Sequence, residues 1–135
     1  MKNGDRAVVH AKGQDRVNIL LVDDQPAKLL SYEVILSELG ENLIKAGSAR
    51  EALEQLLKVD VALILLDVSM PGLGGFGVLH YLRRDGVLDQ ARVIMLTASA
   101  SEDDVRQAIG LGATGYLAKP LDIRLLVDRV DRCMR

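Results

Sequence analysis

Five side chains capable of chemistry stand where apolar segments of this chain end. They are Asp23 and Asp24 after residues 19–22, Asp67 after 61–66, Thr97 after 93–96, and Lys119 after 116–118. The carboxyl ends of parallel strands meet at one edge of a sheet, so we expect these side chains to converge there. Crowded carboxylates repel one another unless a cation lies among them. Hard oxygen ligands suit Mg²⁺, which retains several waters and shares a phosphate oxygen.

A carboxylate is the best candidate nucleophile in this group, because no Cys, His or Ser–His pair is placed to attack. Aspartyl phosphate is an established type of covalent intermediate. A lysine on the same edge can neutralise a phosphoryl oxygen as a point charge, and a threonine hydroxyl can donate to a second oxygen. The residues alone therefore indicate Mg²⁺-assisted phosphorylation of an aspartate.

Alternating strands and helices are needed to position these residues. Six consecutive apolar residues, 61–66, predict a strand that is covered on both faces, which implies a parallel sheet between helices. Five strand–helix units fit the whole pattern, with right-handed crossovers. The predicted strands are 17–22, 42–46, 61–66, 91–96 and 114–118. The predicted helices are 26–39, 48–58, 75–84, 101–110 and a last one from Asp122. In that last helix Leu126, Val130 and Cys133 form an apolar stripe that is expected to face the core.

Local signals mark two of the helix starts. Ser48 followed by Glu51 forms a capping box, and Ser99 followed by Glu102 forms a second candidate. His80 lies among apolar residues of the third helix. We interpret it as a partly buried structural histidine rather than a ligand.

Composition favours a soluble globular domain. The chain has 135 residues, 49% hydrophobic and 27% charged, which fits one domain with residues 1–16 as a flexible leader and 17–135 as the folded unit. Aromatic residues make up 3% and the net charge is −2, so neither a stacking platform nor a basic surface for nucleic acid is indicated. The single cysteine fits a reducing, cytoplasmic setting, and no apolar run is long enough to span a membrane.

The motifs together resemble the receiver domain of bacterial two-component response regulators. The matching stretches, in order and spacing over about residues 17–134, are Ile19–Asp24, Leu65–Pro71, Leu96–Ala98, Gly112-Ala113 and Tyr116–Pro120. This resemblance implies an α/β fold of the flavodoxin-like (βα)5 type. Its doubly wound parallel sheet has strand order 2-1-3-4-5, for which a chemotaxis receiver is a standard example.

The resemblance also assigns the acids. It implies that Asp67 is the phosphoacceptor. It further implies that Asp23 and Asp24 hold Mg²⁺, with Asp67 and the backbone carbonyl of Ser69 completing the protein ligands.

The remaining roles concern the phosphoryl group. The resemblance implies that Lys119 contacts it, with a cis bond between Lys119 and Pro120, and places Ala98 among the cofactor-binding residues. Thr97 is the hydroxyl expected to move toward the phosphoryl group. Tyr116 is the aromatic residue expected to turn inward when Thr97 moves.

Partners follow from the same resemblance. A histidine kinase or a histidine phosphotransfer protein donates the phosphoryl group, and a downstream output protein or domain reads the switched surface. The chain acts alone or within a longer protein such as a hybrid kinase, and a dimer through the last strand–helix units is compatible with this scheme. No direct nucleic-acid or membrane contact and no enzymatic activity beyond self-directed phosphoryl transfer and dephosphorylation are expected.

Three other interpretations fit less well. Gly72, Gly74 and Gly77 satisfy G-x-G-x-x-G, but a dinucleotide site needs this motif directly after the first strand. A haloacid-dehalogenase-like phosphotransferase would need a second aspartate as acid–base where this chain has Ser69. A degenerate receiver acting only as a docking module would lack part of the acid cluster, which is intact in this sequence.

Overall fold

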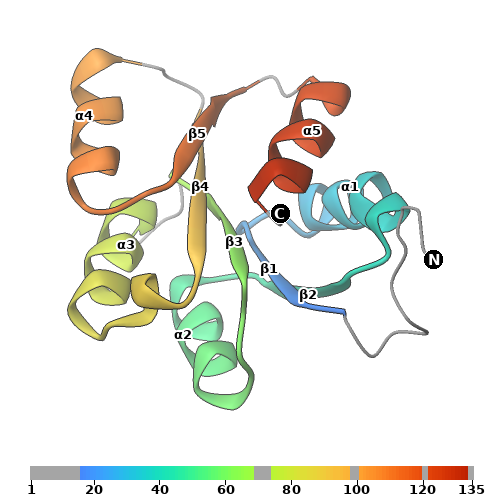
Figure 1. Cartoon of the computed structure of the whole chain (residues 1–135), viewed down its shortest axis with the longest axis horizontal. Coiled ribbons are helices and arrows are strands. Elements are labelled where there is room, and N and C mark those ends of the chain that lie inside the picture. The colour runs from blue at the N-terminus through green and yellow to red at the C-terminus, as the bar shows by residue number, and fades with distance from the viewer. Residues whose placement is uncertain (1–15, 69–73, 98–100, 120–121, 134–135) are drawn as a thin grey trace.

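A parallel five-stranded sheet with helices on both faces forms the core of the molecule (Figure 1). The computed structural model describes residues 16–68, 74–97, 101–119 and 122–133. The sheet order is β2-β1-β3-β4-β5, which confirms the predicted order 2-1-3-4-5. The strands are β1 (Asn18–Val22), β2 (Asn42–Ala46), β3 (Leu63–Asp67), β4 (Arg92–Thr97) and β5 (Gly115–Ala118).

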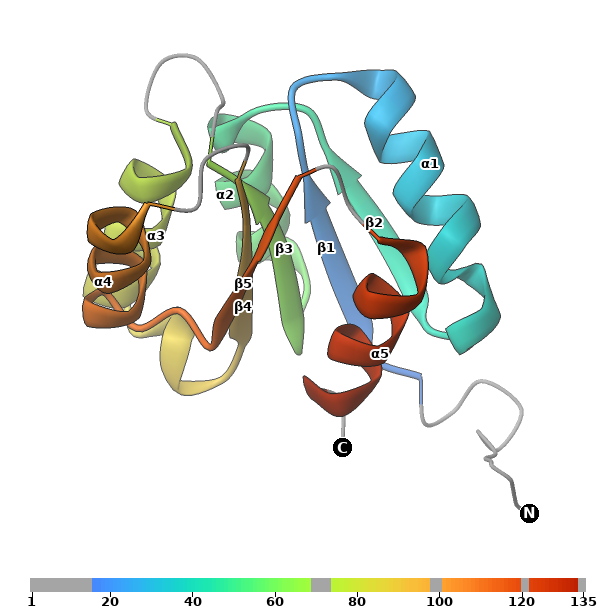
Figure 2. The same ribbon diagram turned by 90° about the horizontal axis from the view of Figure 1, so that it is seen from above.

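The helices divide between the two faces of the sheet. Helices α1 and α5 cover one face, and α2, α3 and α4 cover the other (Figure 2). Their bounds are α1 (Pro26–Leu36), α2 (Ala49–Lys58), α3 (Gly74–Arg84), α4 (Glu102–Gly110) and α5 (Ile123–Cys133). Short 3₁₀ helices at Ser37–Leu39 and Val87–Asp89 follow α1 and α3, so the first predicted helix, 26–39, changes its winding after Leu36.

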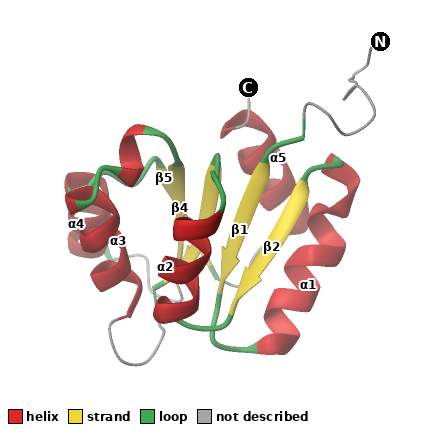
Figure 3. Ribbon diagram, turned by 90° about the horizontal axis from the view of Figure 1, so that it is seen from below, coloured by secondary structure: helices red, strands yellow, loops and turns green. Residues whose placement is uncertain are grey.

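Strand β3 is buried along its whole length, as its apolar run predicts. Side chains alternate between the faces of a strand. Accordingly, Leu63 and Leu65 belong to the core under α1 and α5, whereas Ile64 and Leu66 belong to the core under α2, α3 and α4. The two cores therefore lie on opposite faces of the sheet, between its strands and the helices, which are yellow and red in Figure 3.

The capping box predicted for α2 is confirmed. Ser48 is the N-cap, and its hydroxyl accepts a hydrogen bond from the Glu51 N–H at 3.1 Å. The return contact differs from the usual pattern, because Glu51 accepts from the N–H of Gly47 at 2.6 Å rather than from that of Ser48. Such a cap satisfies backbone donors that the first helical turn leaves open.

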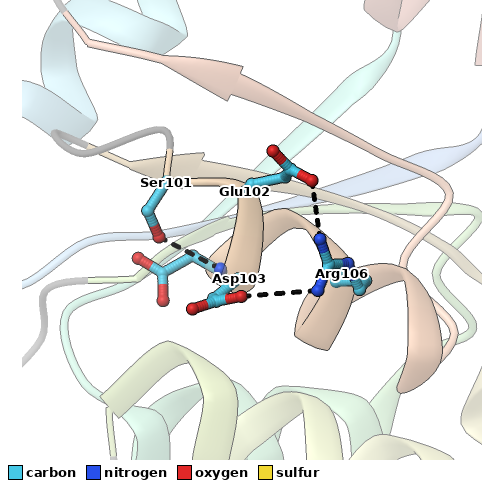
Figure 4. A network of polar contacts seen from close by, with 5 residues as sticks. Ser101, Glu102, Asp103 and Arg106 are labelled. Atoms are coloured by element: carbon cyan, nitrogen blue, oxygen red, sulfur yellow. Dashed lines mark hydrogen bonds and ion pairs between the residues drawn. The ribbon is translucent and has the colours of Figure 1, made fainter.

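The cap predicted for α4 was wrong by two residues. The helix begins at Glu102, and its N-cap is Ser101, not Ser99. The Ser101 hydroxyl accepts from the Asp104 N–H at 3.1 Å, and Arg106 pairs with acids of the first turn (Figure 4). The run Ser99-Ala100-Ser101 offers two serines with an acid three residues later, so the local pattern alone does not select one.

Two further predictions concern single side chains. His80 is exposed, so the partly buried histidine expected there was wrong. The buried positions of α3 are Gly75, Val78, Leu79 and Leu82, and helical geometry turns residue 80 away from them. Cys133 packs half-buried against the core under α1 and α5, in line with its predicted stripe.

The predicted leader, residues 1–16, lies outside the described residues except for its last position. None of the helices in the described ranges combines the length and apolar character that a membrane span requires.

Candidate functional site

The register of the sheet brings the predicted residues to one edge. Asp67 is the last residue of β3 and pairs with Leu96, which places Thr97 one step further along β4. Thr97 pairs in turn with Ala118, the last residue of β5, and Lys119 follows directly. Strands three and four each extend one residue beyond their predicted ends, so Asp67 and Thr97 belong to the strands themselves.

The three aspartates form one cluster. Val22 pairs with Leu66, so Asp23 leaves β1 beside Asp67. One carboxylate oxygen from each of Asp23, Asp24 and Asp67 lies within 4.8 Å of the other two. Asp23 and Asp67 are buried, with 0% and 2% of their surfaces exposed, whereas Asp24 is exposed to solvent. A set of hard oxygen donors with one open side fits Mg²⁺, which is held by few protein ligands and keeps several waters.

Lys119 contacts the buried aspartate directly. Its Nζ donates to Asp67 Oδ1 at 2.9 Å, and only 15% of the lysine side chain is exposed. The Lys119 N–H also donates to the carbonyl of Thr97, which fixes the backbone where β5 ends. Lys119 is therefore not a solvated surface lysine. Among the described residues, the site combines its positive charge with three acids.

Thr97 and Tyr116 occupy neighbouring strands near this edge. Thr97 is buried, with 3% of its surface exposed. Tyr116 is half-buried and packs against the core under α2, α3 and α4. Its hydroxyl is buried, and among the described residues it has no hydrogen-bond partner. A buried hydroxyl without a partner typically costs about 1–3 kcal/mol.

Both carboxylate oxygens of Asp23 accept hydrogen bonds. Oδ1 accepts from the Gln25 N–H at 3.0 Å, and Oδ2 accepts from the Tyr32 hydroxyl at 3.1 Å. Burial raises the pKa of the Asp23 carboxyl and the charge of Asp67 raises it further, while these two hydrogen bonds and Lys119 act in the opposite direction. Burial and the adjacent Asp23 charge raise the pKa of the Tyr32 hydroxyl, so it stays protonated and donates.

Tyr32 was not found by sequence reasoning. It lies on the buried side of α1 with Leu29 and Leu36, where a tyrosine is expected as part of the core. The available signal was its polar hydroxyl, because a buried tyrosine usually finds a hydrogen-bond partner. Only the three-dimensional placement of α1 against the end of β1 shows that this partner is Asp23.

Gly75 explains how α3 approaches the site. A Cβ atom at this position would lie 2.5 Å from the Asp67 carbonyl oxygen and 2.7 Å from the Val68 Cα. The Gly75 N–H donates to the Val68 carbonyl at 3.2 Å. Absence of a side chain therefore lets the first turn of α3 pack directly on the end of β3.

Three predicted positions lie outside the described residues. They are Ser69, whose carbonyl was assigned to Mg²⁺, Ala98, assigned to the cofactor-binding residues, and Pro120, assigned to a cis peptide bond. Their roles stay predictions.

Comparison with known proteins agrees with the fold. Residues 19–131 match the family model described as response regulator receiver domain. The chain is 35% identical over 114 residues to the nitrate/nitrite response regulator protein NarP of Escherichia coli, covering 83% of this chain and 52% of that protein. It is 32% identical over 117 residues to chemotaxis protein CheY-3 of Vibrio cholerae, covering 86% of this chain and 90% of that one.

Among solved structures, chemotaxis protein CheY4 of Vibrio cholerae superposes with a TM-score of 0.82 at 28% identity. The match covers 87% of this chain and 98% of that one. Several matched relatives are longer proteins: the chain spans about half the length of NarP and 16% of the gliding motility regulatory protein of Myxococcus xanthus.

Proposed function

This chain belongs to the response regulator receiver domain family, and on that premise we propose that it accepts a phosphoryl group on Asp67 and so switches a surface read by a partner. The donor in this proposal is a phosphohistidine of a histidine kinase or of a histidine phosphotransfer protein. The output protein or domain reads the surface formed by the last two strand–helix units.

One observation carries the proposal. A buried carboxylate, Asp67, has one oxygen 2.9 Å from the ammonium of Lys119 and lies within 4.8 Å of the oxygens of two other acids. Two of these acids, Asp23 and Asp67, are buried, and burying like charges together is costly unless positive charge offsets them. Its position at the carboxyl ends of the strands is where ligands bind in doubly wound sheets.

The transfer is a displacement at phosphorus. An Asp67 carboxylate oxygen forms the new O–P bond while the P–N bond to the donor imidazole breaks, and the electron pair of that bond returns to the imidazole nitrogen. Lys119 pairs with a phosphoryl oxygen in this proposal, which is supported by the 2.9 Å contact of its Nζ with Asp67 Oδ1. Asp23, Asp24 and Asp67 would hold Mg²⁺, which when bound offsets the negative charge of the acids and of the phosphoryl oxygens.

The response to phosphorylation uses Thr97 and Tyr116 in this proposal. The Thr97 hydroxyl donates to a phosphoryl oxygen, and the space it leaves accommodates the Tyr116 ring. The buried hydroxyl of Tyr116, unpartnered among the described residues, supports a side chain that has a second favourable orientation. A ligand shifts such an equilibrium by its differential affinity for the two states.

The proposal is tested with phosphoramidate, a small donor whose P–N bond resembles that of phosphohistidine. Intact-protein mass spectrometry should show one phosphoryl group on the wild type in Mg²⁺ and little in EDTA. Asp67→Asn should stay unlabelled, while Asp60→Asn, at an exposed acid, should label like the wild type. Equal labelling in EDTA, or labelling of Asp67→Asn, would contradict the assignment.

A further inference from the structure

Tyr32 is a buried aromatic residue whose polar end reaches the acid cluster. It lies on α1 with 5% of its surface exposed, and its ring packs among the aliphatic side chains under α1 and α5. Its hydroxyl donates to Asp23 Oδ2 at 3.1 Å, a contact between side chains nine residues apart. Because the ring belongs to this apolar core, the hydroxyl is the polar end of the side chain, and it is directed toward Asp23.

This hydrogen bond means that both carboxylate oxygens of Asp23 are held by a donor. The Gln25 N–H holds Oδ1 at 3.0 Å, and Tyr32 holds Oδ2. With one contact on each oxygen, the carboxylate plane cannot rotate without breaking a bond. If the Tyr32 hydroxyl is removed, the Asp23 carboxylate keeps its hydrogen bond from the Gln25 N–H but loses the one on Oδ2, so it gains rotational freedom.

The two common biological cations respond differently to such freedom. Mg²⁺ demands near-ideal octahedral geometry at short distances, whereas Ca²⁺ accepts six to eight oxygens in a flexible arrangement. Loss of a group that hydrogen-bonds to a metal ligand typically lowers metal affinity by about 10- to 100-fold. Loss of orientation at Asp23 should therefore weaken Mg²⁺ binding more than Ca²⁺ binding.

We propose that Tyr32 is a positioning residue for the cation site: its hydroxyl fixes the Asp23 carboxylate and thereby favours Mg²⁺ over Ca²⁺. This inference rests on the proposed function, which makes the acid cluster a Mg²⁺ site. The simpler alternative is that Asp23 only satisfies the hydroxyl of a core tyrosine. That structural role would affect stability but would leave the preference between the two cations unchanged.

Tyr32→Phe separates these roles, because it keeps the ring and removes one oxygen. Calorimetric titrations with MgCl₂ and with CaCl₂ give the two dissociation constants. We expect the Mg²⁺ constant to rise about 10-fold and the Ca²⁺ constant to rise less, so that the Mg²⁺/Ca²⁺ preference falls. Tyr81→Phe is the matched control, since Tyr81 lies on α3 and lines a groove with α2; it should behave like the wild type.

Equal weakening of both cations, or no weakening, would overturn the role of Tyr32 while leaving the proposed function intact. Absence of Mg²⁺ binding to the wild type would overturn both. A second measurement needs no variant. In wild-type protein with ¹³C-labelled tyrosine rings, the Tyr32 signals should shift with Mg²⁺ at the midpoint found by calorimetry and the Tyr81 signals should not. An unmoved Tyr32 would also overturn the inference.

Discussion

At the scale of single residues, the ion pair between Asp67 and Lys119 offsets part of the negative charge of the site. The two side chains are 3% and 15% exposed, and their charged atoms lie 2.9 Å apart. Asp23 and Asp24 add negative charge within 4.8 Å, so the lysine contacts a cluster of three acids. The described part of the site is therefore arranged to receive additional positive charge.

Lys119→Met should destabilise the metal-free protein. Removing one partner of a buried ion pair leaves the other charge uncompensated, which typically costs about 3–5 kcal/mol. The value here should lie at the lower end, because Asp67 keeps other interactions. Urea denaturation in EDTA measures the change. Lys58→Met, at an exposed lysine of α2, serves as the control and should change stability by no more than about 0.5 kcal/mol. Equal changes in the free energy of unfolding for both substitutions would mean that the Asp67–Lys119 ion pair does not stabilise the protein.

At the scale of elements, the contact between α3 and the end of β3 connects the fold to the site. Gly75 is buried, and its backbone lies against Asp67 and Val68 with no room for a Cβ atom. The preceding residue, Gly74, has φ +72°, a conformation that side chains disfavour. Two consecutive glycines thus let the helix begin directly beside Asp67, the proposed phosphoacceptor.

Gly75→Ala should lower both stability and phosphorylation. The new methyl group would lie 2.5 Å from the Asp67 carbonyl oxygen, so α3 or the end of β3 must move. Overpacking of this kind typically costs about 1–3 kcal/mol. Gly110→Ala is the matched control, because a Cβ atom there meets nothing within 4 Å in the last turn of α4. Its stability should be unchanged or slightly higher, since alanine is the better helix former. A Gly75→Ala protein as stable and as readily phosphorylated as Gly110→Ala would contradict this packing.

Sequence reasoning succeeded where one local pattern has one structural solution. The apolar run 61–66 predicted a fully buried central strand, and strand-end positions then predicted that Asp67 and Lys119 meet. It failed where two local solutions compete, as with Ser99 and Ser101 before α4. It also missed Tyr32, because its contact with Asp23 depends on how α1 is placed against β1, which no spacing encodes.

At the scale of the whole molecule, the site lies where the strand order reverses. Strand β1 pairs with β2 on one side and with β3 on the other, so the chain crosses to opposite faces of the sheet from this point. Asp23 and Asp24 leave β1 here and Asp67 ends β3 beside them. A cation bound at this place connects two neighbouring strands, and its effect should extend to global stability.

Mg²⁺ should raise the melting temperature of the wild type and barely change that of Asp24→Ala. A ligand that binds the folded state stabilises it by mass action. Asp24 is exposed and belongs to the acid cluster, so its loss removes a ligand without opening the core. In EDTA the variant should be as stable as the wild type or more stable, because one of several like charges is gone. Thermal unfolding with and without MgCl₂ tests this, and equal Mg²⁺ shifts in both proteins would count against the predicted metal ligands.

The central claim, that Asp67 is the phosphoacceptor, has a direct chemical test. Protein treated with phosphoramidate in Mg²⁺ is reduced with borohydride, which converts an aspartyl phosphate to homoserine, and its peptides are then mapped by mass spectrometry. The account predicts homoserine at position 67 and at no other acid. Homoserine at Asp23 or Asp24, or a phosphoryl group that survives reduction on the exposed His80, would contradict it.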